Sequence, residues 1–454
     1  MESIRDIDPA TGETLAEVKC ASLADVEAAV WAARAAAPAW AQVPLETRCE
    51  LIRAAADGLL ARAEEIADLV VAEMGKPRAE ALGEVKGRAR GMAEELEAIG
   101  RALASERLNP ASGEAFLVRD PHGVVAAITP WNFPVAMPLE LLVPALAAGN
   151  TVVFKPSEHV PLVGAVLAEI LGTNLPDGVL NLIQGAGTVG AALVNADVDM
   201  IAFVGSRATG QRIMQSASNG LKRLLLELGG KDPLIVFADA DLDAAADCAV
   251  RHSLRNAGQV CCSVERVYVA REVAADFEAR VLARARTWNA GPGTNPASKL
   301  GPLVSAEQRE KVRVLVDDAV ASGARLVLGG HAIVGPGYFF EPTVLADVPD
   351  RARIATEETF GPVINLAVFS GDEEEAVRLA NATVYGLGAN VYTRDLALGR
   401  RVALRIRSGQ VGVNRYLASA PGSPWVGQRQ SGFGYLGGVD GHRQFTVPKT
   451  VAIA

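Results

Sequence analysis

Gly123-Val124-Val125-Ala126-Ala127-Ile128 is the stretch that decides the fold, because its apolar run predicts a strand. Another strand-like segment, Ala115–Asp120, precedes it across Pro121-His122, and we expect the two to form a hairpin. The chain before them is mainly helical, with helices expected at Leu23–Ala37, twice within Leu45–Val71 and at Ala79–Ala104.

Apolar strands alternate with Ala- and Leu-rich helices from this stretch to Val236. Each intervening segment is long enough for a crossover helix, so the pattern predicts a parallel, doubly wound sheet. The candidate strands are Thr151–Phe154, Leu180–Ile183, Met200–Val204 and Leu224–Leu226.

A second α/β region follows, with helices expected at Leu242–Ala257, Val273–Ala285, Ala306–Ala321 and Glu373–Ala380. Its candidate strands are Pro233–Phe237, Val267–Val269, Arg325–Leu328 and Val363–Val368. The tail Phe445–Ile453 is also strand-like but has no obvious partner in its own domain. It could pair with an edge strand elsewhere, including one of another subunit.

Composition limits the function classes. The net charge is -9 and no basic block stands out, which argues against nucleic acid as a partner. No apolar run is long enough for a signal peptide or a membrane span. The cysteines are scattered without a C-x-x-C pair, so we expect neither a disulfide framework nor a metal site, and a reducing, cytoplasmic compartment.

Two adjacent thiols stand in Asn256-Ala257-Gly258-Gln259-Val260-Cys261-Cys262-Ser263, after a glycine-containing turn. A thiolate is a strong nucleophile, and turn N–H groups can face a developing anion. Cysteine is also a common space-filling residue, so a purely structural pair is the alternative.

Two motifs could bind a cofactor. Gly185-Ala186-Gly187-Thr188-Val189-Gly190 follows a strand and opens a helix, as a dinucleotide-binding turn does. The acidic residue expected about 20 positions later is missing, however, and a tight turn without a ligand is equally consistent. Lys155 and Glu158 follow another strand and could hydrogen-bond a ribose, or could form an ordinary surface ion pair.

Two further residues could serve in catalysis. Glu227 stands between an apolar run and Gly229-Gly230, where partial burial would raise its pKa toward that of a general base. Asn132 stands between prolines and aromatic residues, which would hold its amide rigidly for an oxyanion hole. A loop glutamate and a structural turn are the alternatives.

Taken together and in this order, these motifs resemble the NAD(P)-dependent aldehyde dehydrogenase superfamily. The resemblance runs from Asp8 nearly to the last residue. The matching stretches are Pro130–Pro134, Lys155–Glu158, Phe203–Ser206, Glu227–Lys231, Asn256–Cys261, Glu357–Pro362 and Gly412–Asn414.

The resemblance implies an α/β fold with two doubly wound parallel-sheet domains and a small β oligomerisation element. Residues 1–102 and 122–229 would form a discontinuous NAD-binding domain and residues 230–430 the catalytic domain. Residues 103–121 and 431–454 would form an oligomerisation hairpin and a tail strand, giving a homodimer or homotetramer.

The resemblance also implies the roles of the site residues. Cys261 would be the nucleophile, Asn132 the oxyanion donor and Glu227 the general base. No metal would be needed. The cofactor would be held by Lys155 and Glu158 at the adenosine ribose, Gly205 and Ser206 at the pyrophosphate, Glu358 and Phe360 at the nicotinamide ribose, and by Trp131 and Gly229, with the Gly185–Gly190 turn near the adenine.

The implied reaction oxidises an aldehyde to a carboxylate through a thiohemiacetal and a thioester on Cys261. A thiol esterase that uses the same residues without redox activity is the rival hypothesis. Glu158 favours NAD, because a carboxylate would repel a 2′-phosphate, whereas Arg207 could receive that phosphate in NADP.

The substrate is less defined. Arg255 and Ser419 resemble the carboxylate anchors of succinate-semialdehyde dehydrogenases, but Glu140 stands where that subfamily has a second arginine. We therefore expect a semialdehyde held by Arg255, a neutral to cationic aldehyde tolerated by Glu140, or an Arg255–Glu140 ion pair in an apolar tunnel. The chain also departs from the family's usual Pro-Phe-Gly-Gly at Pro424-Trp425-Val426-Gly427, which concerns packing near the rim of the site.

Overall fold

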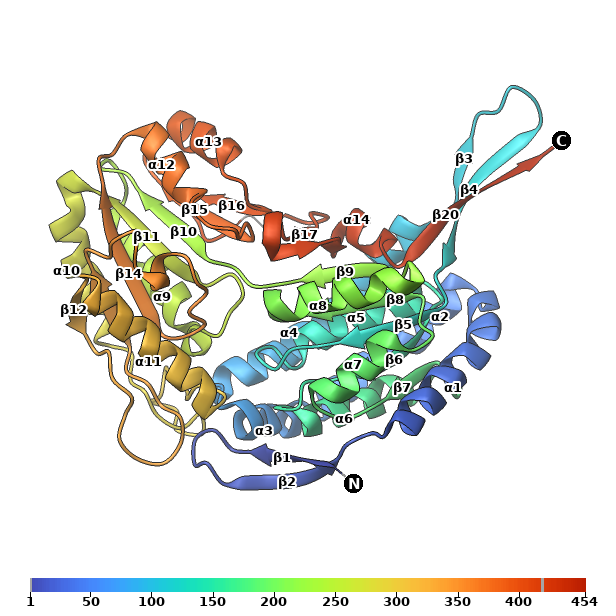
Figure 1. Ribbon diagram of the computed structural model, residues 1–454. Coiled ribbons are helices and arrows are strands. Elements are labelled where there is room, and N and C mark those ends of the chain that lie inside the picture. The colour runs from blue at the N-terminus through green and yellow to red at the C-terminus, as the bar shows by residue number, and fades with distance from the viewer. Residues whose placement is uncertain (1, 418–419) are drawn as a thin grey trace.

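Two largely parallel sheets organise the chain, one in each α/β domain, and a small third sheet projects from the first domain (Figure 1). The structure, a computed structural model, describes residues 2–417 and 420–454. This architecture confirms the expected fold class. Ser419 lies outside the described residues. Within the described ranges, no helix has both the length and the apolar character needed to cross a membrane.

The first sheet has the strand order β18-β9-β8-β5-β6-β7. The strands β5, β6 and β8 are buried throughout and form its parallel centre, and β18 joins one edge antiparallel to β9. Apolar residues on both faces of these strands explain this burial. The bounds are β5 Val124–Ile128, β6 Thr151–Lys155, β7 Leu180–Leu182, β8 Met200–Val204, β9 Arg223–Glu227 and β18 Gly432–Phe433.

Helices cover both faces of the first sheet. The predominantly helical start of the chain is confirmed, although a short antiparallel pair, β1 (Ser3–Ile7) and β2 (Thr14–Lys19), precedes it. The helices are α1 Leu23–Gln42, α2 Leu45–Ala61, α3 Ala63–Met74, α4 Arg78–Leu103, α5 Ala136–Ala147, α6 Pro161–Gly172, α7 Gly187–Asn195 and α8 Arg207–Ala217, with the 3-10 turn η1 Ser218–Gly220.

The second sheet has the order β12-β13-β14-β11-β10-β15-β16, and only β12 runs antiparallel to its neighbour. Its strands are β10 Asp232–Val236, β11 Val264–Ala270, β12 Arg325–Leu328, β13 Thr343–Ala346, β14 Val363–Phe369, β15 Gly388–Tyr392 and β16 Gln410–Val413. Its helices and turns are α9 Leu242–Leu254, η2 Arg255–Gly258, η3 Arg271–Val273, α10 Ala274–Ala285, α11 Ala306–Ala321, η4 Arg353–Ala355, α12 Glu373–Ala380 and α13 Leu396–Arg405.

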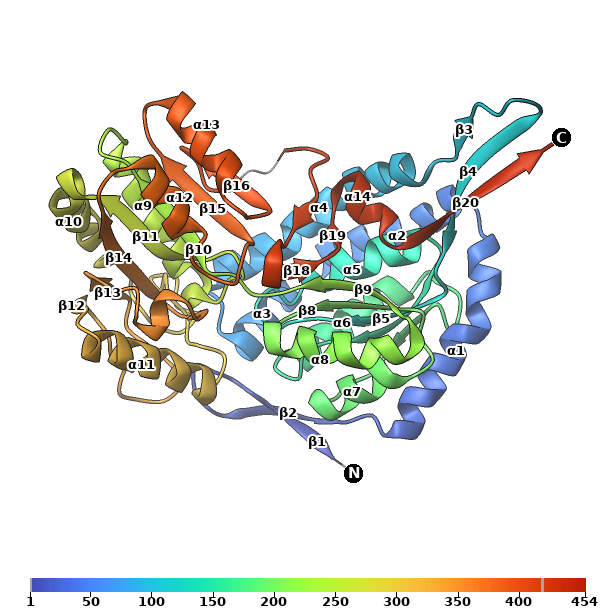
Figure 2. The same cartoon turned by 45° about the horizontal axis from the view of Figure 1, so that its top comes forward.

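The third sheet corrects the expected hairpin of Ala115–Ile128. β4 (Glu114–Pro121) pairs with β3 (Glu106–Leu108) and with the tail strand β20 (Thr446–Ile453), whereas β5 is a central strand of the first sheet. β20 therefore finds its partner within its own chain, and both views show it beside β4 (Figures 1 and 2). The hairpin is wrong because β5 is apolar on both faces and is paired in parallel on both sides by β6 and β8.

The segment before the tail strand binds back onto the first domain. β17 (Trp425–Val426) pairs with β19 (Tyr435–Leu436), while β18 between them extends the first sheet, and the turn η5 (Arg429–Ser431) joins β17 to β18. The helix α14 (Gly438–Arg443) packs on α4. This segment thus leaves the second domain and joins the first sheet beside β9.

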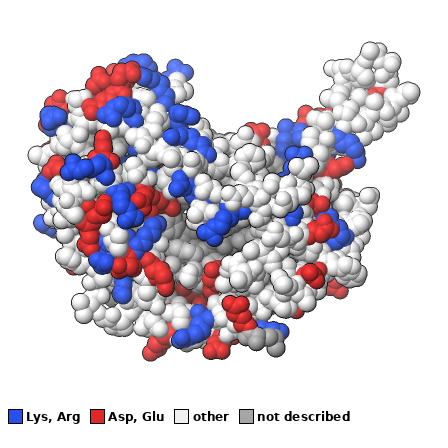
Figure 3. Space-filling view, viewed as in Figure 1, with Lys and Arg blue, Asp and Glu red and all other residues white. Residues whose placement is uncertain are grey.

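The two sheets bring the predicted motifs to one place. Thr129–Pro134 follows β5, Lys155 ends β6, Gly205 follows β8 and Glu227 ends β9, so all four lie at the carboxyl end of the first sheet. The second domain contributes the turn before β11 and the turn before β14. In the space-filling view the surface is hollowed between the two domains (Figure 3).

Candidate active site

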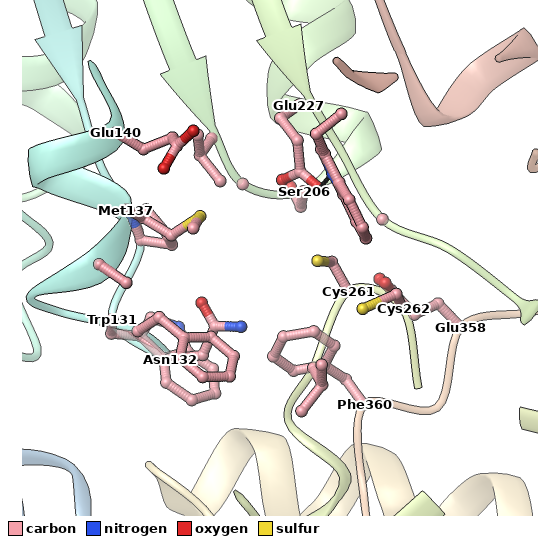
Figure 4. Close-up of a pocket in the computed structure, with 18 of the residues that line it drawn as sticks. Trp131, Asn132, Met137, Glu140, Ser206, Glu227, Cys261, Cys262, Glu358 and Phe360 are labelled. Carbon is pink, nitrogen blue, oxygen red and sulfur yellow. Dashed lines mark hydrogen bonds between the residues drawn. The ribbon is translucent and has the colours of Figure 1, made fainter. Parts of the chain in front are cut away.

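A cavity of about 510 Å³ lies between the domains. Cys261, Glu227 and Asn132 all line it, together with several residues expected at the cofactor (Figure 4). The full lining is Pro130, Trp131, Asn132, Phe133, Ala136, Met137, Glu140, Val204, Gly205, Ser206, Glu227, Gly229, Arg255, Val260, Cys261, Cys262, Gln308, Lys311, Glu358, Phe360, Trp425 and Leu436.

The turn before Cys261 has an unusual backbone. Asn256, Ala257 and Gly258 have φ values of 52°, 56° and 71°, a run in the left-handed region that costs energy at the non-glycine residues. At Gly258 a Cβ would lie 2.0 Å from the carbonyl oxygen of Gly361, so only glycine is accommodated there. The expected helix Leu242–Ala257 accordingly ends at Leu254, because the chain reverses its handedness here.

The buried side chain of Gln259 holds this turn in place. Its Nε2 donates to the carbonyl of Asn256 at 3.1 Å, and its Oε1 accepts from the N–H of Val304 at 2.9 Å. The Nδ2 group of Asn256 donates to the carbonyls of Asn132 and Gln259, at 3.0 and 3.1 Å. These bonds offset the backbone strain and fix the position of Cys261.

Asn132 is buried against this turn. Its Nδ2 donates to the carbonyl of Gln259 at 3.0 Å, which fixes the orientation of the amide. An amide nitrogen has two hydrogens, so one remains for a ligand oxygen in the cavity. Figure 4 shows the amide pointing into the cavity, on the side of Cys261.

Glu227 lies across the cavity from Asn132, at the end of β9, and is only 4% exposed. Burial raises the pKa of its carboxyl to about 8, although hydrogen bonds with the Cys261 thiol and the Trp425 indole lower it in part. The Trp425 Nε1–H donates to Oε1 of Glu227 at 3.3 Å. A carboxyl with such a pKa can take and release a proton near neutral pH.

The two thiols differ in exposure and acidity. Cys261 is partly exposed and its sulfur projects into the cavity, whereas Cys262 is buried. A hydrogen bond with Cys262, burial and the charge of Glu227 raise the pKa of Cys261. The same thiol–thiol hydrogen bond, aided by the Tyr416 hydroxyl, lowers the pKa of Cys262 to about 7. Both thiols line the cavity, so the greater exposure of Cys261, and not its acidity, distinguishes it from Cys262.

The residues expected at the adenosine and pyrophosphate lie along the edge of the first sheet. Lys155 is buried and donates to the carbonyl of Pro156 at 2.8 Å, and its Nζ is 3.9 Å from the more exposed Glu158 carboxylate. A side chain at Gly190 would meet Lys155 at 3.5 Å, which places the Gly185–Gly190 turn beside it.

Gly205 and Ser206 directly precede α8. A Cβ at Gly205 would lie 2.5 Å from the Phe203 ring. Because glycine has no side chain, a ligand can approach the backbone closely there. Ser206 caps the helix by accepting from the N–H of Thr209 at 3.3 Å, and helix N-termini attract phosphate. Arg207, the residue that could receive a 2′-phosphate, donates to Gln430 at 2.7 Å and lies over the Tyr385 ring at 5.7 Å.

Glu358 and Phe360 come from the turn before β14. Glu358 accepts from the N–H of Gly230 at 3.0 Å, and burial raises its pKa to about 7. At Gly229 a Cβ would meet the Glu358 carboxylate at 2.4 Å, so the glycine makes room for it. The Trp131 and Phe360 rings meet edge to face with centroids 5.5 Å apart.

A buried ion pair supports this turn. The Glu265 carboxylate accepts from Lys231 Nζ at 2.5 Å, from the N–H of Thr359 at 2.7 Å and from that of Phe360 at 2.9 Å. Glu265 is not among the residues predicted from the sequence. No local pattern marks it, because its partners are far away in the chain.

The substrate side of the cavity also differs from expectation. Glu140 pairs with Arg88 at 2.9 Å, and Arg88 bonds Glu95 at 2.8 Å. The expected Arg255–Glu140 ion pair is therefore wrong within the described residues. Arg255 lies over the Phe133 ring at 5.6 Å and has no carboxylate within salt-bridge distance in the described part of the chain.

Comparison with known proteins identifies relatives of this chain. The model of the aldehyde dehydrogenase family matches residues 1–451. A succinate-semialdehyde dehydrogenase of Paenarthrobacter nicotinovorans is 40% identical over 97% of this chain and 99% of its own. A betaine aldehyde dehydrogenase of Cereibacter sphaeroides is 39% identical over 98% of this chain and 93% of its own.

Solved structures agree with this relationship. The lactaldehyde dehydrogenase of Escherichia coli superposes with a TM-score of 0.96 at 34% identity, over 100% of this chain and 96% of that chain. An NAD-dependent aldehyde dehydrogenase of Sinorhizobium meliloti gives a TM-score of 0.96 at 38% identity, over 100% and 91%.

Proposed function

The chain belongs to the aldehyde dehydrogenase family, and from this premise we propose that it oxidises an aldehyde to a carboxylate through Cys261, Glu227 and Asn132 with NAD as cofactor. The observation that supports this most is the convergence of these three side chains on one cavity from two domains. It is an enzyme of that family; the chemistry assigned to each residue is our proposal.

The first half of the reaction forms a covalent adduct. The Cys261 thiol gives its proton to its hydrogen-bonding neighbour Glu227, which passes it to solvent, and the thiolate attacks the aldehyde carbon to give a thiohemiacetal. The free Nδ2–H of Asn132 and the backbone N–H of Cys261 donate to the oxyanion, an interaction typically worth about 3–4 kcal/mol. The hydrogen bond from Asn132 to Gln259 already orients the amide, so little reorganisation is needed.

The second half hydrolyses a thioester. A nicotinamide held at Glu358 and Phe360 would supply the acceptor for the hydride that leaves the thiohemiacetal carbon. Glu227 then takes a proton from a water molecule whose oxygen bonds to the thioester carbon. The carbon–sulfur bond breaks, the carboxylate product leaves and Cys261 is regenerated.

The residues around the cavity suit a dinucleotide. Lys155 and Glu158 would hold the adenosine ribose, Gly205 and Ser206 the pyrophosphate, and Glu358 the nicotinamide ribose. The support is steric as well as chemical, because a side chain at Gly205 or Gly229 would collide with its neighbours. Glu158 disfavours a 2′-phosphate, and Arg207 is engaged with Gln430, so NAD is preferred over NADP.

We propose that the substrate is an aldehyde that carries a distal carboxylate, such as a short semialdehyde. Arg255 lines the cavity and has no carboxylate within salt-bridge distance in the described part of the chain, while Arg88 pairs with Glu140. The relationship to a succinate-semialdehyde dehydrogenase points the same way. A cationic aldehyde is the second candidate, because Trp425 and Phe133 line the cavity and a betaine aldehyde dehydrogenase is nearly as similar.

A homodimer or homotetramer is supported by the third sheet. β20 is an edge strand over eight residues, and Val447, Val451 and Ile453 on it are exposed. Few charged residues cover the projecting tip (Figure 3). Such an edge is suited to pairing with another copy of the chain. A reducing, cytoplasmic location is supported by five free thiols.

A kinetic panel tests the proposal. Succinate semialdehyde, an aliphatic aldehyde, an aromatic aldehyde and an aminoaldehyde are each assayed with NAD and with NADP by reduced-cofactor absorbance. We expect turnover that is lost in Cys261→Ala and is best with the semialdehyde and NAD. Ester cleavage without cofactor-dependent oxidation would favour the thiol esterase instead. Full activity of Cys261→Ala would refute the assigned nucleophile.

A further inference from the structure

Trp425 is the one aromatic residue that contacts Glu227 through a polar atom in the described part of the chain. It stands where the family resemblance leads us to expect phenylalanine, which has no hydrogen-bond donor in its side chain. The indole N–H donates to Oε1 of Glu227 at 3.3 Å, and both side chains line the cavity. The departure from the family pattern therefore changes the surroundings of the proposed base.

The backbone around Trp425 is attached to the strand that ends with Glu227. Gly432 on β18 is the register partner of Glu227, and the N–H of Leu228 donates to the carbonyl of Ser431 at 2.9 Å. On the other side, Trp425 pairs with Leu436 in the β17–β19 ladder. The indole and the carboxylate are thus held by one continuous backbone network.

Side chains anchor the same segment to the second domain. The buried Ser431 hydroxyl accepts from the N–H of Gly386 at 2.9 Å, and Gln410 Nε2 donates to the carbonyl of Pro424 at 2.7 Å. Trp425 therefore has little freedom to move away from Glu227. A hydrogen-bond donor that is already held in place stabilises a charged carboxylate more than a donor whose side chain must first be ordered.

The donors to Glu227 change during the proposed reaction. In the free enzyme the carboxyl has two hydrogen-bonding neighbours, the Cys261 thiol and the Trp425 indole. Once Cys261 is acylated, its sulfur is bonded to the acyl carbon and carries no proton. The indole N–H is then the only side-chain donor to Glu227 within the described residues. This is the stage at which Glu227 must act as a base.

We infer that Trp425 is a positioning residue for the hydrolytic half of the reaction, in which its indole N–H orients the Glu227 carboxylate and stabilises its charged form while water attacks the thioester. The inference rests on the proposed function. In the step itself, Glu227 takes one proton from water, the water oxygen bonds to the acyl carbon, and the carbon–sulfur bond breaks. The sulfur then recovers a proton and the carboxylate leaves.

The substitution Trp425→Phe isolates the N–H, because it keeps an aromatic ring in the cavity. The acyl-enzyme is formed with nitrophenyl acetate, and its loss is followed by rapid quench and mass spectrometry across pH. We expect hydrolysis about tenfold slower at neutral pH, since a donor to the charged form is lost. We also expect the acid limb of the rate profile to move upward by roughly one pH unit.

Hydroxylamine adds a readout that a packing defect would not give. It attacks a thioester without needing a base to activate it, so it should restore fast loss of the acyl group in Trp425→Phe. With aldehyde and cofactor, the variant should show a rapid burst of reduced cofactor followed by a slower steady state. The wild-type enzyme should show little burst of reduced cofactor and little acceleration of acyl loss by hydroxylamine.

The controls separate this inference from the proposed function. Trp31→Phe, at a tryptophan that is 74% exposed on α1, is the matched exchange and should behave as wild type. Glu227→Gln should stall at the acyl-enzyme, and adding Trp425→Phe to it should slow hydrolysis no further. If Glu227→Gln hydrolyses at the wild-type rate, the proposed base is wrong.

If Glu227→Gln stalls but Trp425→Phe keeps the wild-type acid limb and hydrolysis rate, only the role of Trp425 is refuted. A change confined to the KM for the aldehyde would refute it as well, because it would show that the ring only packs against the substrate.

Discussion

Arg88 donates to Glu140 at 2.9 Å, and this bond removes Glu140 as a partner for Arg255. The relationship supports our proposal of an anionic aldehyde among the substrate classes that the sequence left open. A carboxylate without a partner in the cavity would repel an anionic aldehyde, whereas a neutralised one leaves the charge of Arg255 to dominate.

The first prediction concerns Arg255 itself. Arg255→Gln keeps a donor but removes the charge, so the KM for a semialdehyde should rise about 30-fold, while that for a neutral aliphatic aldehyde should change less than about twofold. Steady-state kinetics with both substrates measure the difference. Arg271→Gln, at an exposed arginine on η3, is the matched control. Equal effects on both substrates would show that Arg255 only supports the cavity wall.

The second prediction concerns Arg88. Arg88→Met leaves Glu140 and Glu95 without their cation, so the KM for a semialdehyde should rise and that for an aminoaldehyde should fall. These groups are partly exposed, so we expect a loss of only about 1–2 kcal/mol in the free energy of unfolding, measured with urea. Adding Glu140→Gln should restore the semialdehyde KM. If it does not, Glu140 is not the charge that the substrate senses.

The third prediction concerns the turn that holds Glu358 and Phe360. Glu265→Gln weakens the bonds to the N–H groups of Thr359 and Phe360 and leaves the buried Lys231 without its counter-ion. We expect a KM for the cofactor about tenfold higher and an unfolding free energy about 3 kcal/mol lower.

A paired exchange separates these two effects of Glu265. Lys231→Met with Glu265→Leu removes both buried charges and should recover much of the stability, yet it should leave the cofactor KM raised. Recovery of cofactor binding in the pair would show that the N–H bonds to Glu265 do not position the turn.

The elements that sequence predicted best are those whose local pattern matches their final environment. β8, β12, α11 and α12 have the expected bounds, because their apolar residues repeat with the period of the element and glycine or a capping residue ends it. β15 and β16 were missed, since both are short and contain glycine. The hairpin error arose because Pro121-His122 looks like a turn, although β5 has the fully apolar pattern of a central parallel strand.

The site residues found by sequence all lie in motifs that are continuous in the chain. Arg88, Glu265 and Tyr416 escaped detection because each acts across a long sequence separation, and a lone charged or aromatic residue has no local signature. Trp425 was visible as a departure from the family pattern, but the contact with Glu227 required the register of β18 on β9.

The fourth prediction concerns a carboxyl pair remote from the cavity. Burial raises the pKa of Asp6 to about 6, and burial together with the charge of Asp6 raises that of Glu73. The folded protein therefore binds more protons than the unfolded chain above the ordinary pKa values. The contribution of this pair to the free energy of unfolding is full below the ordinary pKa values of the two carboxyls and should be lost as pH rises through about 6.

Asp6→Asn tests this dependence by removing one of the two charges. Its unfolding free energy should fall less than that of the wild type between about pH 5 and pH 8, measured by urea denaturation. Asp57→Asn, at a surface carboxyl on α2, is the control and should keep the wild-type slope. An unchanged slope in Asp6→Asn would show that the pair does not hold a proton in the folded state.

The fifth prediction concerns the second thiol. The Tyr416 hydroxyl donates to the carbonyl of Cys262 at 2.7 Å and to its sulfur at 3.2 Å. The ring is stacked on His252 with centroids 3.4 Å apart, and burial lowers the pKa of His252 to about 3, so this imidazole is neutral. Tyr416 is thus a fixed donor to Cys262.

Tyr416→Phe should therefore raise the pKa of Cys262 from about 7 toward its ordinary value. The rate of Cys262 alkylation by iodoacetamide, resolved by peptide mass spectrometry in a Cys261→Ser background, should shift to higher pH and slow several-fold at neutral pH. The serine keeps a hydroxyl donor beside Cys262, so the tyrosine contribution is measured alone. An unshifted alkylation profile would mean that Tyr416 only holds the loop and leaves the thiol chemistry unchanged.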